Sequence, residues 1–103
     1  MKKEAQKKVM SREDLTAMVR GVQNGEDAAL ANMYEAFHDS LFGYILVLVN
    51  KNKDLAADLT QDTFIEIMQS IHSLDEPVAF VTWSRQIAYR RCTAYFKKRH
   101  DFW

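Results

Sequence analysis

Cations and aromatic residues are mixed near the end of this sequence. Between Phe80 and His100 the chain carries six Arg or Lys residues and no carboxylate, whereas the formal net charge of all 103 residues is zero. Cations attract phosphates, and exposed aromatic rings offer stacking surfaces to unpaired bases. A solvated basic surface is the plainer interpretation, but it leaves the aromatic rings unexplained. Helical spacing therefore predicts a face for single-stranded nucleic acid, and Lys97, Lys98 and Arg99 at its end are expected to meet phosphates. The other members of this face are Thr82, Arg85, Gln86, Tyr89, Thr93 and Phe96.

The stretch before it has the opposite charge. Residues 54–76 hold six acids and no Lys or Arg. On a helix, Asp58/Asp62 and Asp62/Glu66 are like-charge pairs at i,i+4, each unfavourable by about 0.2–0.5 kcal/mol. An ordinary acidic surface is one interpretation. An interface with a basic protein is the other, since Ile65 would be an apolar anchor inside a charged rim. The face predicted to bind protein consists of Asp58, Gln61, Asp62, Ile65, Glu66 and Gln69.

Residues able to act in catalysis or to hold a metal are few. Cys92 is the single cysteine, so neither an intrachain disulfide nor a Cys-based metal cluster can form. His38, His72 and His100 are not spaced with each other or with Cys92 to suggest a metal site or a nucleophile–base pair. We therefore expect a protein that is not an enzyme and uses no cofactor or metal, with Cys92 as a small filler residue.

Long helices must position both faces. Apolar residues recur every three or four positions, and Pro and Gly are scarce. The sequence predicts one all-α domain, a compact bundle of about four helices. Ser11 is the expected cap of the first helix and Asp54 that of the third, and Pro77 is expected in the first turn of the fourth. The expected helices span residues 12–23, 26–49, 55–71 and 77–99.

The core-facing positions follow from the same spacing. The fourth helix has an apolar stripe of Phe80, Trp83, Ile87 and Ala94. Arg91 projects onto that stripe, so we expect its side chain to extend toward solvent or the helix end to have left the core. The residues that the third helix is expected to turn inward are Leu55, Leu59, Phe64, Ile67, Met68 and Ile71.

The remaining segments are short. We expect residues 1–10 to form a flexible basic arm, residues 11–100 the helical domain, and residues 101–103 the start of a linker or the end of an excised piece. The opening MKKEAQKKVM lacks the apolar stretch of a signal peptide, and the longest apolar run, residues 44–49, is too short to span a membrane. A cytoplasmic protein without membrane insertion is the expectation.

Three motifs in the two charged segments are familiar. They are DLTQDTFIEIMQSI (58–71), EPVAF (76–80) and W..QIAYR (83–90), preceded by GVQNGEDAALANMYEAFHDSLFGYILVLVNKNKDLAADLTQDTF. The ordered series resembles region 2 of the extracytoplasmic-function (ECF) sigma factors, in the sigma-70 family. The resemblance covers about residues 12–99.

The resemblance implies a sigma factor domain with two tasks in bacterial transcription initiation. In that family the DLTQDTF helix binds the coiled coil of the β′ clamp of RNA polymerase. The following loop and the last helix recognise and melt the −10 promoter element and capture an unstacked base of the non-template strand. Carried over by position, the polymerase-facing residues are Asp58, Gln61, Asp62 and Ile65. The base-capturing loop is His72, Ser73, Leu74 and Asp75, and the residues that meet DNA are Arg85, Gln86, Tyr89, Arg90, Thr93 and Lys97.

The sequence also departs from the family. Arg90 and Arg91 stand where members often have Asn and an aliphatic residue, and Ala94 stands where Asp is frequent, so the promoter sequence does not transfer. The sequence ends before the helix-turn-helix domain that reads the −35 element, which indicates an excised domain or a split or degenerate sigma factor. The alternative function is a helical adaptor that binds protein only, for example an anti-sigma factor, which is also an expected partner of a sigma domain.

Overall fold

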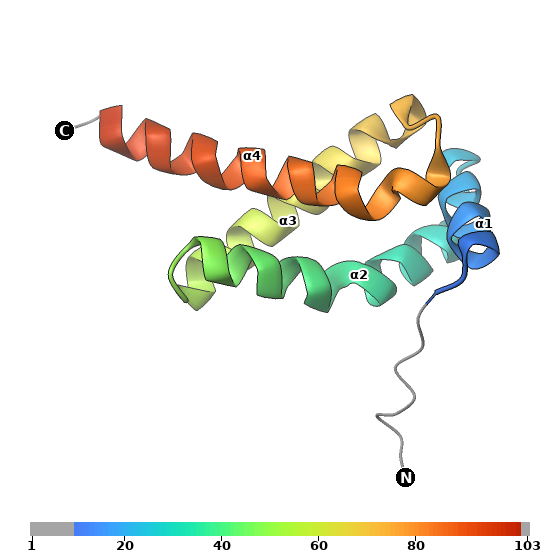
Figure 1. Cartoon of the computed structure of the whole chain (residues 1–103), viewed down its shortest axis with the longest axis horizontal. Helices are drawn as coiled ribbons and strands as arrows, with labels where there is room; N and C mark the ends of the chain where they lie inside the picture. Colours follow the sequence, from blue (N-terminus) through green and yellow to red (C-terminus); the bar gives the residue numbers. More distant parts are fainter. Residues whose placement is uncertain (1–9, 102–103) are drawn as a thin grey trace, which may run out of the picture.

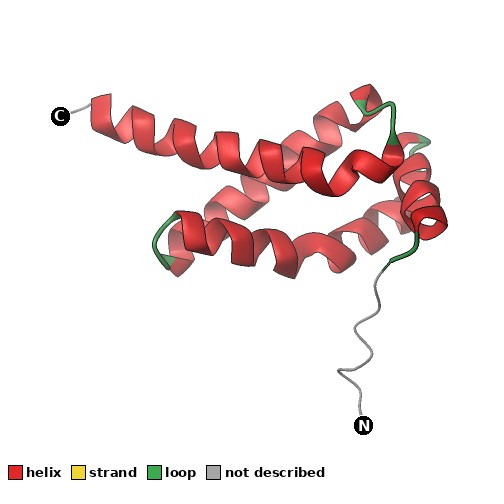
Figure 2. Cartoon of the chain, in the orientation of Figure 1, coloured by secondary structure: helices red, strands yellow, loops and turns green. Residues whose placement is uncertain are grey.

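The computed structural model describes residues 10–101, and this part of the chain contains helices and no strand (Figure 2). The expected all-α fold is thereby confirmed. The predicted arm (1–10) and end (101–103) lie, apart from Met10 and Asp101, outside the described residues. The four main helices are α1 (Arg12–Gln23), α2 (Asp27–Leu48), α3 (Lys53–Ser70) and α4 (Phe80–Asp101), and two short 3₁₀ turns, η2 (Ile71–Ser73) and η3 (Pro77–Ala79), lie between α3 and α4.

Three helices form the body of the domain and α1 closes one end. α2 and α4 run in the same direction and α3 runs the opposite way, while α1 lies where α2 and α4 begin (Figure 1). α1 packs against α2 and against both 3₁₀ turns. The last turns of α4 extend beyond the other helices (Figure 1). α1 therefore supports the connection between α3 and α4, whereas the end of α4 has little structure around it.

Local capping agrees with the sequence at α1 and differs at α3. Ser11 Oγ accepts a hydrogen bond from the Asp14 amide at 3.0 Å, as expected. The cap of α3 is Asn52, whose Oδ1 accepts from the Leu55 amide at 3.1 Å, so the prediction of Asp54 as the cap is wrong. The reason is a tight turn with positive φ at the two residues before Asn52, which starts the helix two residues earlier than expected.

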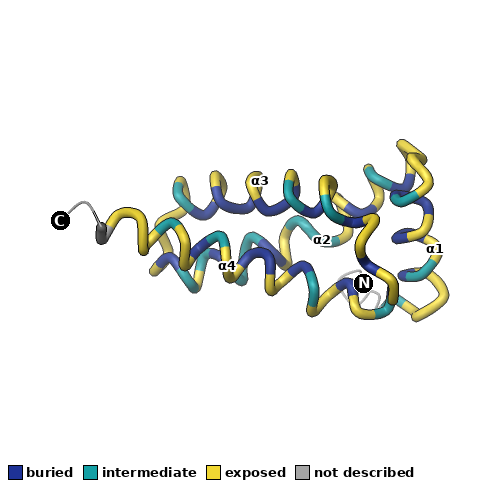
Figure 3. Tube along the Cα trace, turned by 90° about the horizontal axis from the view of Figure 1, so that it is seen from above, coloured by how far each residue is buried: buried dark blue, intermediate teal, exposed yellow. Residues whose placement is uncertain are grey.

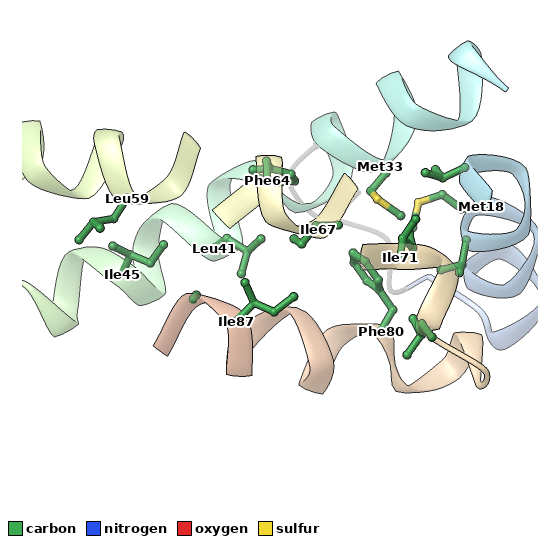
Figure 4. Packing of buried hydrophobic residues seen from close by; sticks show 14 of the residues in the cluster. Met18, Met33, Leu41, Ile45, Leu59, Phe64, Ile67, Ile71, Phe80 and Ile87 are labelled. Atoms are coloured by element: carbon green, nitrogen blue, oxygen red, sulfur yellow. The ribbon is translucent and has the colours of Figure 1, made fainter. Parts of the chain in front are cut away.

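An apolar core fills the space between the helices (Figure 4). The Phe80 ring is fully buried, and its centroid lies 5.0 Å from that of Phe37 in an edge-to-face contact. Truncating a buried Phe to Ala costs about 3–5 kcal/mol. Both outer faces therefore depend on the same core. Its other large, fully buried apolar residues are Val19, Met33, Leu41, Ile45, Ile67, Ile71 and Ile87.

The inner side of α3 is shifted from the predicted one. Met68 was expected inside but is 43% exposed, and Leu55 is half-buried. Thr60 and Thr63 are buried instead, and each hydroxyl donates to the carbonyl one turn earlier at 2.7 Å. Because these local bonds satisfy the hydroxyl groups, threonine can occupy the core and Met68 faces outward. The residues buried as predicted are Leu59, Phe64, Ile67 and Ile71.

The start of α4 is also displaced. Pro77 begins the short turn η3 rather than the helix, which starts three residues later at Phe80. Ile87 is buried as predicted, but Trp83 is only half-buried and Ala94 is exposed. Ala94 is exposed although its neighbour Tyr95 packs against the core, so the buried side of α4 has turned away from Ala94. The buried side continues instead through Ser84, Ala88 and Cys92.

Candidate protein and nucleic-acid interfaces

The predicted acidic face lies on the outer side of α3. Figure 3 shows the exposed positions of α3 on the side turned away from the other helices. Five of the six predicted residues are exposed there, and Ile65 is an apolar side chain among them. The exposed members are Asp58, Gln61, Asp62, Ile65 and Gln69.

Glu66 differs from the other residues predicted on this face. Its side chain is 22% exposed, and Oε1 accepts a hydrogen bond from Arg91 Nε at 2.7 Å. Its second oxygen lies 3.4 Å from a guanidinium nitrogen of Arg90. Glu66 thus joins α3 to α4. The pair also explains how Arg91 is accommodated beside the core, since its charged end reaches the carboxylate at the margin of the core.

An apolar groove between α2 and α3 lies beside the acidic face. A hollow of about 850 Å³ is lined in part by Tyr34, His38, Phe64 and Met68. The Tyr34 ring lies 4.8 Å from the Phe64 ring, centroid to centroid, and Tyr34 is half exposed. An adjoining hollow of about 620 Å³ extends the groove to Ile65 and Gln61 of α3. The acids that line the first hollow are Asp27, Glu35 and Asp39.

Sequence reasoning missed this groove. Met68 was expected in the core because it fits the apolar spacing of the third helix, and no surface role was predicted for Tyr34. Two buried threonines, Thr60 and Thr63, show how α3 is rotated about its axis. With Thr60 and Thr63 inside, Met68 lies at the edge of the buried stripe.

The predicted nucleic-acid face lies along the outer side of α4, and its residues are exposed. Tyr89 is 50% exposed and stands in a hollow of about 490 Å³ with Arg85 and Gln86. Tyr44 of α2, which the sequence did not indicate, also lines it, and the Arg85 guanidinium lies 5.2 Å from the centre of the Tyr44 ring. This cation–π contact restrains Arg85 at the surface. The exposed members of the face are Thr82, Arg85, Gln86, Tyr89, Arg90, Thr93, Phe96, Lys97, Lys98 and Arg99.

The loop predicted to capture a base is part turn and part core. Leu74 is only 7% exposed and belongs to the apolar core, so its side chain does not line an open pocket. His72, Ser73 and Asp75 are exposed, and the Ser73 hydroxyl donates to the Ser70 carbonyl at 2.7 Å. The loop therefore presents polar groups on either side of an apolar anchor.

Cys92 is buried on α4, and burial raises the pKa of its thiol. A buried neutral thiol is a poor nucleophile, which agrees with a packing role.

Known proteins resemble this chain over the elements that carry both faces. The family described as Sigma-70 region 2 matches residues 33–101, a segment that contains most of α2 and all of α3, the loop and α4. The ECF RNA polymerase sigma factor SigX of Bacillus subtilis (strain 168) is 27% identical over 67 residues, which cover 65% of this chain and 34% of the relative. The chain thus spans about a third of the length of the curated relative it matches. No solved structure matches.

The likeness to SigX agrees with the ECF resemblance of the three sequence motifs. Within residues 10–101, no helix combines the length and the apolar character that crossing a bilayer requires. The family match includes α3 with its acidic face and α4 with its basic face, and the all-α bundle is the fold expected of that family. The chain belongs to the sigma-70 region 2 family.

Proposed function

We propose that this domain acts in transcription initiation as region 2 of an ECF-type sigma factor. Its α3 face binds the coiled coil of the polymerase β′ clamp, and its α4 face with the adjoining loop recognises and melts the −10 promoter element. The observation that carries the proposal is that two outer faces of opposite charge lie on helices within the segment that matches Sigma-70 region 2. Each face has its own recess, one of about 850 Å³ lined in part by acids and one of about 490 Å³ lined in part by Arg85 and Arg90.

The groove beside α3 supports a helical protein partner. Ile65, Met68 and Tyr34 are large exposed side chains near a rim of acids. Apolar anchors within a charged rim are typical of interfaces that receive the apolar side of a helix. The acidic rim favours a partner with Lys or Arg on either side of its apolar residues. We expect a coiled-coil helix of the clamp to meet this requirement, and an anti-sigma factor to compete for the same groove.

The α4 face supports an unpaired strand rather than a duplex alone. Arg85 and Gln86 offer hydrogen-bonding groups beside the exposed ring of Tyr89. Stacking on an aromatic side chain is worth about 1–3 kcal/mol per base. Because a base must leave the duplex to reach the ring, this energy favours the melted state and lowers the cost of strand separation.

The proposal is tested with the domain itself and fluorescent oligonucleotides. Fluorescence anisotropy measures its affinity for single strands with a −10-like sequence and with the same bases scrambled. We expect tighter binding of the −10-like strand and capture of the domain by a β′ clamp fragment. Binding to the clamp fragment together with equal affinity for both strands would instead support the protein-only adaptor.

A further inference from the structure

The end of α1 is bound to the connection between α3 and α4 by a set of hydrogen bonds. Gln23 Nε2 donates to the carbonyl oxygens of Ile71, at 2.7 Å, and of Leu74, at 2.9 Å. In return, His72 Nε2 donates to the backbone carbonyl oxygen of Gln23 at 3.0 Å. Arg20 donates to Gln23 Oε1 at 3.0 Å. Residues from two distant parts of the sequence thus form one network with Gln23 at its centre.

These bonds match the donors and acceptors that two helix ends leave open. Gln23 is the last residue of α1, so its carbonyl lacks an intrahelical partner. The carbonyl of Ile71, the C-cap residue of α3, accepts the Leu74 amide at 3.0 Å and has a second lone pair left for Gln23. The Gln23 carboxamide has two N–H donors and one acceptor oxygen, and the network uses all three. The reverse orientation of the amide would set its oxygen against two carbonyl oxygens. The network therefore specifies a single orientation.

The two carbonyls held by Gln23 belong to the residues on either side of His72 and Ser73. Arg20 also reaches the Asp75 carbonyl, at 3.4 Å. The backbone of the proposed base-capturing loop is thus held from α1. A pocket discriminates among bases only if its walls keep their positions.

We propose that Gln23 is a positioning residue for base selection, which holds residues 72–75 in the shape that discriminates among bases without itself contacting the base. This inference rests on the base-capturing role proposed above for the loop. It gives α1, which carries none of the predicted site residues, a part in promoter recognition.

The test uses Gln23→Glu, which keeps the side-chain length but replaces the donating nitrogen with an oxygen that repels both carbonyls. Asn32→Asp makes the same amide-to-acid change at an exposed position of α2 and is the matched control. The first measurement is the hydrogen exchange rate of the Leu74 amide, which donates to the Ile71 carbonyl, relative to the Ile67 amide within α3. The second is the ratio of dissociation constants between the worst-bound and the best-bound of four single strands that differ at one base.

In Gln23→Glu we expect Leu74 exchange to rise by about tenfold relative to Ile67. We expect the ratio of dissociation constants between the worst-bound and the best-bound strand to fall by about fivefold or more, with binding of the clamp fragment retained. Asn32→Asp should change neither. If Gln23→Glu does not fold, Gln23→Met removes the donors without adding charge.

Unchanged Leu74 exchange, or faster exchange with an unchanged ratio of dissociation constants, would overturn the inference. The wild-type ratio is measured first. A wild-type ratio of one would refute base capture itself and the inference with it. A wild-type ratio above one that the Gln23 variant retains in full would refute the role of Gln23 alone.

Discussion

The outer faces of α3 and α4 are both exposed, yet the side chains that they present and the recesses beside them differ. On α3, acids stand beside an apolar groove that Tyr34 and Met68 help to line. On α4, cations stand around Tyr89 in a smaller, more polar hollow. A groove of the first kind excludes water around the apolar side of a helix, whereas a surface of the second kind accepts a flexible strand through phosphate contacts and stacking.

Charge alone does not separate the two proposed tasks. The chain has no net charge, and Glu66 of the acidic helix is paired with Arg90 and Arg91 of the basic one. What separates the proposed tasks is the kind of apolar group that each face exposes. Aliphatic and aromatic side chains line a groove beside α3, whereas aromatic rings stand among cations on α4. Variants that act on one face should therefore leave the other unchanged.

The largest expected effect on one face comes from Asp62→Lys. Reversing a charge at the centre of the α3 face should weaken binding of a β′ clamp fragment by about 2 kcal/mol or more, about thirtyfold in the dissociation constant. The fold should be retained, because the change relieves repulsion with Asp58 and Glu66 at i,i+4. Titration calorimetry with the clamp fragment measures the effect. Glu13→Lys on α1 makes the same charge change outside this face and should bind normally. Full binding by Asp62→Lys would remove α3 from the interface.

Tyr89→Ala should weaken the binding of single-stranded DNA to the α4 face. If a base stacks on this ring, the affinity for single-stranded DNA falls by about 1–3 kcal/mol, with little change in the salt dependence. Fluorescence anisotropy over a series of salt concentrations measures both quantities. Tyr89→Phe keeps the ring and should bind nearly as well as the wild type. A Phe variant as weak as the Ala variant would show that the hydroxyl group, rather than stacking, binds the strand.

A smaller and different effect is expected at the end of α4. Lys97 and Lys98 belong to the last two turns of α4. Because these turns extend beyond the other helices (Figure 1), the two lysines can meet phosphates but have little structure to orient them. Replacing both by Ala should weaken all strands alike and reduce the salt slope by about 0.7 for each phosphate that is no longer neutralised. Lys53→Ala, on α3, is the control. A change in base preference would mean that these lysines read sequence.

The smallest effect on binding is expected from Glu66→Gln. Because Glu66 is bound to Arg91, the substitution should lower the free energy of unfolding by about 1 kcal/mol and leave clamp binding close to normal. Urea unfolding followed by circular dichroism gives the stability, and Asp58→Asn serves as the comparison at an exposed acid. Unaltered stability combined with a clamp defect as large as that of Asp62→Lys would place Glu66 in the interface.

The exposed positions on the two faces followed from the sequence better than the recesses beside them. Helical spacing was sufficient to place Asp62 and Tyr89 outside, because exposure on a helix follows from the rotation of that helix alone. Met68 was misplaced because the rotation of α3 follows from the burial of Thr60 and Thr63. That burial depends on local hydrogen bonds of the two hydroxyl groups, which a hydrophobicity pattern does not include.

The contacts between distant segments were not predictable at all. The bonds of Gln23 to the loop and the packing of Tyr44 against Arg85 join residues that lie far apart in the sequence. A pattern along one helix contains no information about which other element lies beside it. The pairing of Glu66 with Arg91 is also a contact between distant segments. The position of Arg91 on the apolar stripe had indicated only that its charged end must lie outside the core.

The separation of the two faces is tested most directly by adding both partners to one sample. A labelled −10-like single strand is bound to the domain, and β′ clamp fragment is then titrated while the anisotropy of the strand is followed, with the fragment and strand alone as the control. If the clamp binds α3 and the strand binds α4, the anisotropy rises further as a larger ternary complex forms. A fall to the value of the free strand would mean that the two partners compete for one surface, and the division of tasks between α3 and α4 would be wrong.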